Sequence, residues 1–339
     1  MKETIINPDL FFKTVKNNVK PEKCLFCGER RKIANSHSVP RRILKSITND
    51  GWVLGYDTLI NPSDRTSRGE GLNKSGTFWM ICKACDNAFF KHYESMPDEV
   101  PDEPSDQLMA EIALKDNVFH LSETIAEREA YRLLIEENPH DDFLVARKRV
   151  LDLDFETFSR ATERYRRMVQ EGVKRGTFKI LLWTRLTFKT QLAAQSQIPL
   201  ALDMEGRKIN DNFDYRHRTQ SMHIAVFPLH DETIVLAFYD KLDKKYQALH
   251  KQMTTKSLED NLEFINYVIF EYTSNVFLSK SAFEIIKTNR SLQVTAAENN
   301  GLPNLGQDIY TWDDLEIMKQ LYQGPNLTNL PNFLSSKYI

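Results

Sequence analysis

Four cysteines, the only ones in the chain, stand in two Cys-x-x-Cys pairs, Cys24/Cys27 and Cys82/Cys85. Two thiol pairs of this spacing, brought together across a long insertion, suit a tetrahedral four-thiolate zinc site. The alternative is a set of buried thiols without metal. A zinc ion closed in by four thiolates has no open position for water, so this zinc is predicted to be structural. Any catalysis must then come from residues that the zinc holds in place.

The elements around these cysteines follow a simple order. The first Cys-x-x-Cys pair precedes a short strand over 32–39, which Pro40 limits. A polar excursion then leads to a β-prone run over 77–81 and directly into the second pair. Residues 86–95 are predicted to form a helix. The order is therefore cysteine pair, strand, excursion, strand, cysteine pair and helix, with His37 in the first strand.

This pattern resembles the zinc-stapled branch of the HNH, or ββα-metal, endonuclease family. In that family a Cys-x-x-Cys pair precedes a strand with a His followed closely by Pro, and a second pair opens a helix that binds a catalytic divalent metal. Here His37 has Pro40 three residues on, and Cys85 leads into Asp86. The resemblance covers residues 20–95 and implies that Cys24, Cys27, Cys82 and Cys85 are the structural zinc ligands.

The resemblance further implies that His37 is the general base, facing Asp86, and activates water for attack on a phosphodiester. It places a catalytic Mg²⁺ or Mn²⁺ at the start of the helix after Cys85. On one continuous helix, Asp86, Asn87 and Glu94 share an arc of roughly 100°, which His92 and Lys91 lie outside. Asp86 is the first candidate ligand, Asn87 the second and Glu94 the third. Asp86 is equally explained as an acidic residue that stabilises a helix N-terminus.

The chain departs from the family pattern at two positions. Ser36 stands where the family has Asp or Glu before the catalytic His. The family's middle Asn has no unambiguous counterpart, with Asn73 as the nearest candidate and Asn35 as another. A packing histidine in a purely structural zinc ribbon is the corresponding alternative for His37.

Basic residues are concentrated near the N-terminus. Residues 1–95 hold 16 Lys and Arg against 10 Asp and Glu, whereas the remainder carries a net charge of −8. Arg41, Arg42 and Lys45, just after Pro40, are candidate contacts to DNA phosphates, although a solvated helical face explains them nearly as well. The arginines over 160–167 lie among glutamates and are expected to form a salt-bridged helix.

The predicted fold class is α+β, with a zinc-bound ββα-metal unit followed by a mostly helical domain that has a β-hairpin. The domains are 1–95, an acidic Pro-rich linker over 96–107, and 108–339 for recognition, regulation or oligomerisation. The hairpin joins strands over 221–228 and 233–239. Helices are expected over 107–138, 142–150, 155–173, 179–195, 258–271, 281–288 and 312–322.

Other functional classes lack support in the sequence. No apolar run reaches about 18 residues, so no transmembrane helix is expected, and the N-terminus lacks the apolar stretch of a secretory signal. A cytoplasmic location follows from these features and from cysteines suited to metal. Phosphate-binding loops and hydrolase elbows are also missing.

The sequence therefore favours a metal-dependent HNH-type endonuclease that hydrolyses DNA, with RNA as a further possible substrate. By analogy with the family, its setting would be restriction or phage defence. The alternative is a non-catalytic zinc-ribbon adapter that binds nucleic acid or protein. A third hypothesis is a toxin-like nuclease held inactive until the C-terminal domain responds to a trigger. Residues 108–339 would also carry any protein partner or homo-oligomer contact.

Overall fold

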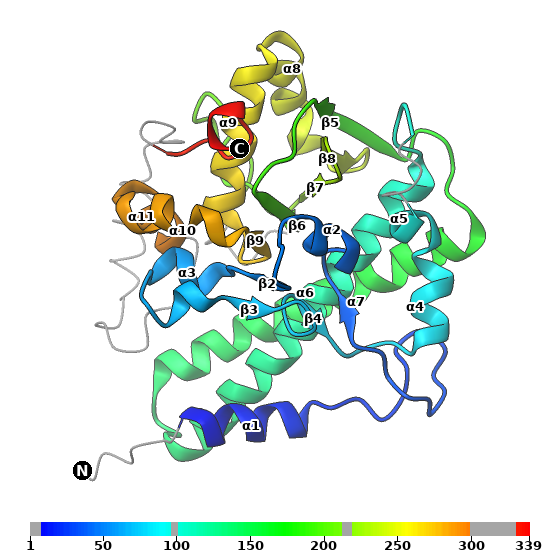
Figure 1. Ribbon diagram of the computed structural model, residues 1–339. Helices are drawn as coiled ribbons and strands as arrows, with labels where there is room; N and C mark the ends of the chain where they lie inside the picture. The colour runs from blue at the N-terminus through cyan, green and yellow to red at the C-terminus, as the bar shows by residue number, and fades with distance from the viewer. Residues whose placement is uncertain (1–7, 96–100, 212–218, 299–329) are drawn as a thin grey trace. The chain divides into compact units, whose positions relative to one another are not determined.

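The computed structural model describes residues 8–95, 101–211, 219–298 and 330–339 (Figure 1). Helices and strands are mixed, which confirms the predicted α+β class. The chain forms two compact units, each assembled from separate stretches of sequence. We call Met1–Ser36, Thr77–His92 and Ala110–Gly172 the cysteine unit, and His37–Gly76, Tyr93–Met109 and Val173–Ile339 the sheet unit.

This grouping differs from the predicted division at residue 95. Residues 37–76 were expected to belong with the cysteines, but they group with the sheet. Long-range hydrogen bonds explain the difference: Leu54 and Leu278 pair through their backbones at 2.8 and 2.9 Å, and the Ser46 hydroxyl donates to the carbonyl of Pro228. Of the predicted linker, residues 96–100 lie outside the described part. Beyond them, the carbonyl of Asp102 accepts from the Trp183 indole at 2.7 Å.

The cysteine unit is mainly helical. Its helices are α1 (Pro8–Asn18), α4 (Lys83–Phe89), α7 (Asp142–Glu171) and most of α6 (Asp106–Glu137). Strand β4 (Thr77–Phe78) precedes α4, and β1 (Ser36–His37) and α5 (Lys91–Ser95) lie where the chain passes between the units. Strands β1 and β4 form a two-stranded sheet.

The two long helices of the cysteine unit are joined by charged and apolar contacts. Arg128 of α6 pairs with Asp152 of α7 at 2.7 Å, and Tyr131, Leu144 and Leu151 form a small buried cluster. The helix predicted over 107–138 is confirmed by α6. The break predicted between 150 and 155 is wrong: the chain there has no Gly or Pro, and burial of Leu151 holds α7 continuous.

The predicted salt-bridged helix at 160–167 is confirmed. Arg160 pairs with Glu156, and Arg166 and Arg167 both pair with Glu163, at distances from 2.6 to 3.2 Å. These pairs lie three or four residues apart on α7, the spacing at which helical side chains meet.

The sheet unit is built on five antiparallel strands in the order β5-β8-β7-β6-β9. Their bounds are β5 (Phe178–Leu186), β6 (Leu192–Ile198), β7 (Met222–Pro228), β8 (Thr233–Asp240) and β9 (Val276–Leu278). The predicted hairpin is confirmed by β7 and β8. Every residue of these two strands is buried, so both of their faces are covered.

The helix predicted over 179–195 is wrong, since that segment forms β5 and most of β6. The first half is rich in Thr, Trp, Phe and Ile, which favour strands. The second half, Leu-Ala-Ala-Gln, favours a helix locally. Pairing of β6 between β7 and β9 overrides that preference.

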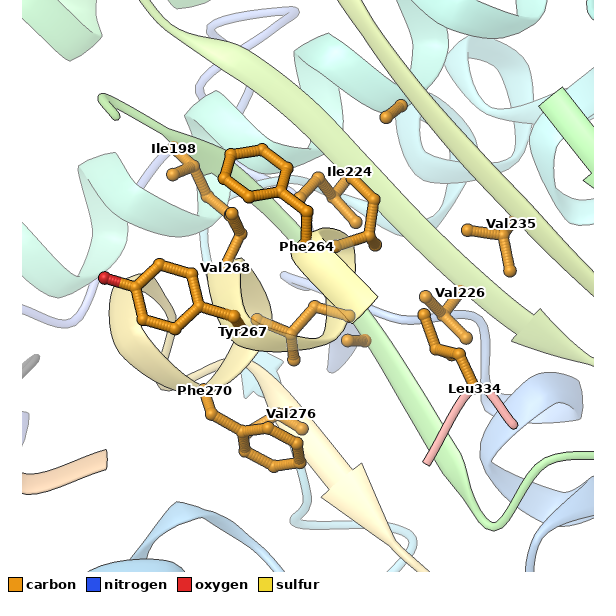
Figure 2. Packing of buried hydrophobic residues seen from close by; sticks show 14 of the residues in the cluster. Ile198, Ile224, Val226, Val235, Phe264, Tyr267, Val268, Phe270, Val276 and Leu334 are labelled. Atoms are coloured by element: carbon orange, nitrogen blue, oxygen red, sulfur yellow. The ribbon is translucent and has the colours of Figure 1, made fainter. Parts of the chain in front are cut away.

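Helix α9 (Leu258–Tyr272) packs on the sheet and forms much of its core. Ser257 caps the helix: its hydroxyl accepts from the Asp260 N–H, and the Asp260 carboxylate accepts from the Ser257 N–H. Figure 2 shows Phe264 and Val268 of α9 beside Ile198 and Ile224 of the sheet. The helix predicted over 258–271 is confirmed.

The remaining elements of the sheet unit are short. They are α2 (Arg41–Ser46), β2 (Trp52–Val53), α3 (Tyr56–Ile60), η1 (Thr66–Arg68), β3 (Glu70–Gly71), η2 (Lys244–Tyr246), α8 (Gln247–Thr255), η3 (Lys280–Ala282), α10 (Phe283–Thr288), α11 (Arg290–Glu298) and η4 (Ser336–Tyr338). The helix predicted over 312–322 lies outside the described residues.

Candidate functional site

The four cysteines meet in the cysteine unit, as their spacing predicts. Their sulfur atoms all lie within 4.8 Å of one another, and Sγ of Cys27 lies 4.0 Å from Sγ of Cys82. A tetrahedral zinc ion with bonds of about 2.3 Å places its sulfur ligands roughly 3.8 Å apart. The cluster could therefore hold a metal such as zinc. Among the described residues, no other group of three or more Cys, His, Asp or Glu side chains is arranged to do so.

Backbone geometry builds this cluster. Gly28 follows the first pair with φ +70°, and its N–H donates to the carbonyl of Cys24 at 2.9 Å. A left-handed residue at this point suits glycine and closes the turn. The Cys82 N–H donates to Sγ of Cys24 at 3.2 Å, and α4 begins at the next residue.

The thiols of the cluster do not ionise alike. Burial acts to raise the pKa of Cys24, but backbone N–H groups of Cys27, Cys82 and Phe26 outweigh it and lower this pKa to about 7. Burial, followed by hydrogen bonds to the other thiols, raises the pKa of Cys85. A cysteine binds a metal ion as its thiolate. The lowered pKa of Cys24 therefore favours the form of this side chain that can bind a metal.

Asp86, the first candidate ligand of a catalytic metal, is held by a buried lysine. Its Oδ1 lies 2.9 Å from Nζ of Lys115, whose side chain has no exposed surface, while the Asp86 side chain is 20% exposed. The same ammonium lies 3.8 Å from the ring centroid of Phe90. A divalent cation would have to bind a carboxylate that already neutralises an ammonium ion. Asp86 in this arrangement does not fit the predicted role.

Lys115 was not among the residues predicted from the sequence. The signal was present: Glu111, Lys115, Asp116 and Asn117 interrupt an otherwise apolar stretch of α6, and all four are buried. Buried charges in proteins are normally paired. The side chain of His92, which lies outside the predicted arc of ligands, is 60% exposed, and its Nδ1 lies 2.7 Å from a carboxylate oxygen of Glu111.

The helix predicted over 86–95 is two helices. Helix α4 ends at Phe89, and the wholly buried Phe90 has φ −120° and ψ 27°, which is outside helical geometry. Glu94 therefore lies on α5, so the arc that placed it beside Asp86 does not apply. Asn87 is exposed on α4.

His37 belongs to the sheet unit, where a backbone carbonyl orients its ring. Nε2 lies 2.8 Å from the carbonyl oxygen of Leu72. A carbonyl can only accept, so Nε2 carries the proton and Nδ1 is the basic nitrogen. His37 is half-buried. An imidazole held in this tautomer has the orientation that a general base requires.

A buried polar network holds the residue after His37. The Ser38 hydroxyl donates to Oδ1 of Asn275 at 2.7 Å and lies 3.0 Å from the carbonyl oxygen of Gly76. The Tyr93 hydroxyl donates to the carbonyl of Ser38 at 2.7 Å and lies 2.7 Å from Oε1 of Gln195. Nδ2 of Asn275 donates to the backbone of Gln195. The histidine segment is thereby attached to the sheet, which no local pattern indicated.

Ser36, Asn73 and Asn35 stand at the positions where the sequence departs from the HNH pattern. The Ser36 side chain is buried, and its hydroxyl has no hydrogen-bond partner among the described residues. It supplies no negative charge. Asn73 is exposed, and its Oδ1 accepts from Nε of Arg41 at 3.3 Å; Asn35 is exposed as well.

Helix α2 presents the predicted DNA contacts to solvent. Arg41, Arg42 and Lys45 are exposed, whereas Ile43 and Leu44 are buried. The helix is amphipathic, and its solvent face carries three cations. His37 and α2 group with the sheet, and Asp86 groups with the cysteines, so the predicted facing of His37 and Asp86 stays a prediction.

Comparison with protein-family models, curated proteins and solved structures finds no match to this chain. A search of the helices in the described residues finds none long and apolar enough to cross a membrane.

Proposed function

We propose that this chain is a metal-dependent HNH-type endonuclease that hydrolyses DNA, in restriction or phage defence. The observation that carries the proposal is the orientation of His37 by the Leu72 carbonyl, which makes Nδ1 its basic nitrogen. The four-thiol cluster supports it as the structural zinc site of such an enzyme.

In the proposed reaction, Nδ1 of His37 takes a proton from water while the water oxygen bonds to phosphorus. The bond from phosphorus to the leaving oxygen breaks, and that oxygen takes a proton from solvent. The exposed cations of α2 would hold neighbouring phosphates. Asp86 does not fit as a ligand of Mg²⁺ or Mn²⁺ while it pairs with Lys115, so the catalytic metal has no assigned ligand and metal dependence is a property to be tested.

The test is cleavage of supercoiled plasmid with added Mg²⁺ or Mn²⁺. The wild-type protein should nick or cut the plasmid. His37→Ala should abolish cleavage and leave the zinc content unchanged, because His37 is not a zinc ligand. His230→Ala is the matched control, since the His230 side chain is 95% exposed in the hairpin turn. Equal cleavage by His37→Ala and the wild type would refute the proposed base.

A second candidate function is a non-catalytic zinc-ribbon adapter for nucleic acid or protein. The Asp86–Lys115 pair favours it, because that pair stands where the family binds its catalytic metal. Ser36 in place of the usual acid favours it too. The adapter would bind DNA in a salt-dependent way and leave plasmid intact during long incubation with Mg²⁺ or Mn²⁺.

A further inference from the structure

A hollow in the sheet unit is lined by several basic side chains, all of them far from His37 in the sequence. It has a volume of about 660 Å³ and is formed by the loop after Asp203, by η2 and by α8. Its lining includes one acidic and four basic side chains, which are Glu205, Arg207, Lys244, Lys245 and Lys251.

The loop that walls this hollow is fixed by a buried carboxylate. Asp203 is 1% exposed. One of its oxygens accepts from the backbone N–H groups of Glu205 and Arg207, both at 2.9 Å. The other accepts from Nε2 of Gln252 at 2.7 Å and from Nε of Arg207 at 3.1 Å. The wall therefore has a set shape before any ligand arrives.

The charges that line the hollow do not balance. Arg207 pairs with Asp203 and Glu205, which leaves the three lysines Lys244, Lys245 and Lys251 as its excess positive charge. Residues 241–256 hold five Lys and one Asp, in a part of the chain whose net charge is otherwise strongly negative. Clustered like charges destabilise the folded state, and a bound anion relieves that cost.

The position of two of these lysines also opposes helix stability. Lys244 and Lys245 immediately precede α8, which begins at Gln247 and has no acidic residue in its first turn. The macrodipole favours negative charge at a helix N-terminus and disfavours cations there. An anion bound in the hollow would be attracted by both the lysines and the helix end.

The lining identifies the class of anion. Pockets for small organic ligands are mostly apolar, and sites that bind unpaired bases stack them on aromatic rings. Among the described lining residues Ala248 is the only apolar one, and none is aromatic. Lysine ammonium groups bind phosphates as mobile point charges. The lining suits a phosphodiester backbone whose bases stay out of the hollow.

We propose that this hollow binds the phosphate backbone of duplex DNA through Lys244, Lys245 and Lys251. The inference rests on the proposed function only in taking DNA as the ligand. It adds a contact region for the substrate in the loop after Asp203 and in residues 244–255, within a domain for which the sequence predicted only recognition, regulation or oligomerisation in general.

The test measures binding without added divalent cation, so cleavage plays no part. Fluorescence anisotropy of a short labelled DNA duplex gives the affinity between about 50 and 200 mM salt. The triple variant Lys244→Gln/Lys245→Gln/Lys251→Gln should lower the slope of log affinity against log salt by about 2.7, at about 0.9 per lysine, and weaken binding by up to roughly 500-fold near 0.1 M salt. The control Lys189→Gln/Lys287→Gln/Lys337→Gln removes the same charge from exposed lysines outside the hollow.

We call the triple variant at Lys244, Lys245 and Lys251 the pocket variant. The proposal is overturned if the slope of log affinity against log salt is unchanged in the pocket variant, or if the control lowers it equally. Calorimetry with inorganic tripolyphosphate separates DNA from a small polyphosphate. One possible result is that the wild type binds tripolyphosphate tightly while the pocket variant loses that binding and keeps its DNA affinity. That result would assign the hollow to a small anion and overturn the DNA contact. A protein that binds DNA through this hollow but never cleaves it would refute the proposed endonuclease alone.

Discussion

The ion pair between Asp86 and Lys115 can be tested by removing its charges separately. Nζ and Oδ1 are 2.9 Å apart, so with an effective dielectric constant of about 20 their attraction is about 6 kcal/mol before desolvation. The two partners differ in exposure: Lys115 has no exposed side-chain surface, and Asp86 is 20% exposed. That difference makes the cost of losing each partner unequal.

Asp86→Asn removes the charge that balances a wholly buried ammonium ion, and should destabilise the protein by about 3 to 5 kcal/mol. Lys115→Met keeps the length of the side chain and leaves a carboxylate that water can reach, so a loss of about 1 to 3 kcal/mol is expected. The double variant buries no charge at this point and should lie within about 2 kcal/mol of the wild type. With single losses of about 4 and about 2 kcal/mol and a double variant close to the wild type, the cycle predicts a coupling energy of roughly 6 kcal/mol.

Urea unfolding followed by far-ultraviolet circular dichroism measures these differences, because the cysteine unit is largely helical. Zinc-loaded protein should be used throughout. The ion pair does not stabilise the fold as described if Asp86→Asn costs less than about 1 kcal/mol, or if the double variant is less stable than both single variants. A stable Asp86→Asn protein with weakened Mg²⁺ binding would instead restore Asp86 as a metal ligand.

Three further predictions concern zinc, the histidine segment and pH. Wild-type protein should hold one zinc ion by elemental analysis. Cys27→Ser removes a ligand, so it should weaken zinc affinity by more than the roughly 10- to 100-fold loss typical of removing a residue that only hydrogen-bonds to a ligand. Unchanged zinc affinity would exclude Cys27 from the site. Gly76 has φ +59°, and a Cβ there would lie 2.7 Å from both the Ser38 hydroxyl and the Phe277 ring. Gly76→Ala should therefore lower the free energy of unfolding, measured in urea, by about 1 to 3 kcal/mol. An unchanged free energy of unfolding would contradict this close approach. Hydrogen bonds from Arg166 and Arg167 lower the pKa of Glu163 from 4.5 to about 2. The stability that ionised Glu163 contributes is therefore complete above about pH 4.5 and is lost as the pH falls through about 2. A midpoint near 4.5 for the Glu163 carboxyl in an NMR titration would refute this prediction.

Short-range patterns in the sequence determined several features correctly. The Cys-x-x-Cys spacing predicted the thiol cluster, because two residues between cysteines fix a turn that needs no distant partner. Two β-prone runs on either side of the turn over 230–232 predicted β7 and β8. Glutamates three or four residues from arginines predicted the pairs on α7. The hairpin strands and the ion pairs of α7 join residues that are close in the chain, and each Cys-x-x-Cys turn is local even though the two turns meet from 55 residues apart.

Tertiary structure alone decided the features that bear on function. Strand β6 exists because β7 and β9 lie on either side of it, although Leu-Ala-Ala-Gln favours a helix. His37 is positioned by Leu72 and by a network that reaches Asn275, and Asp86 is neutralised by Lys115. The side-chain contacts of Asp86 and of the histidine segment join residues 29 to 237 positions apart. Local propensity carries no information about such partners, so the same residue types that suggested a metal ligand formed an ion pair once the chain had folded.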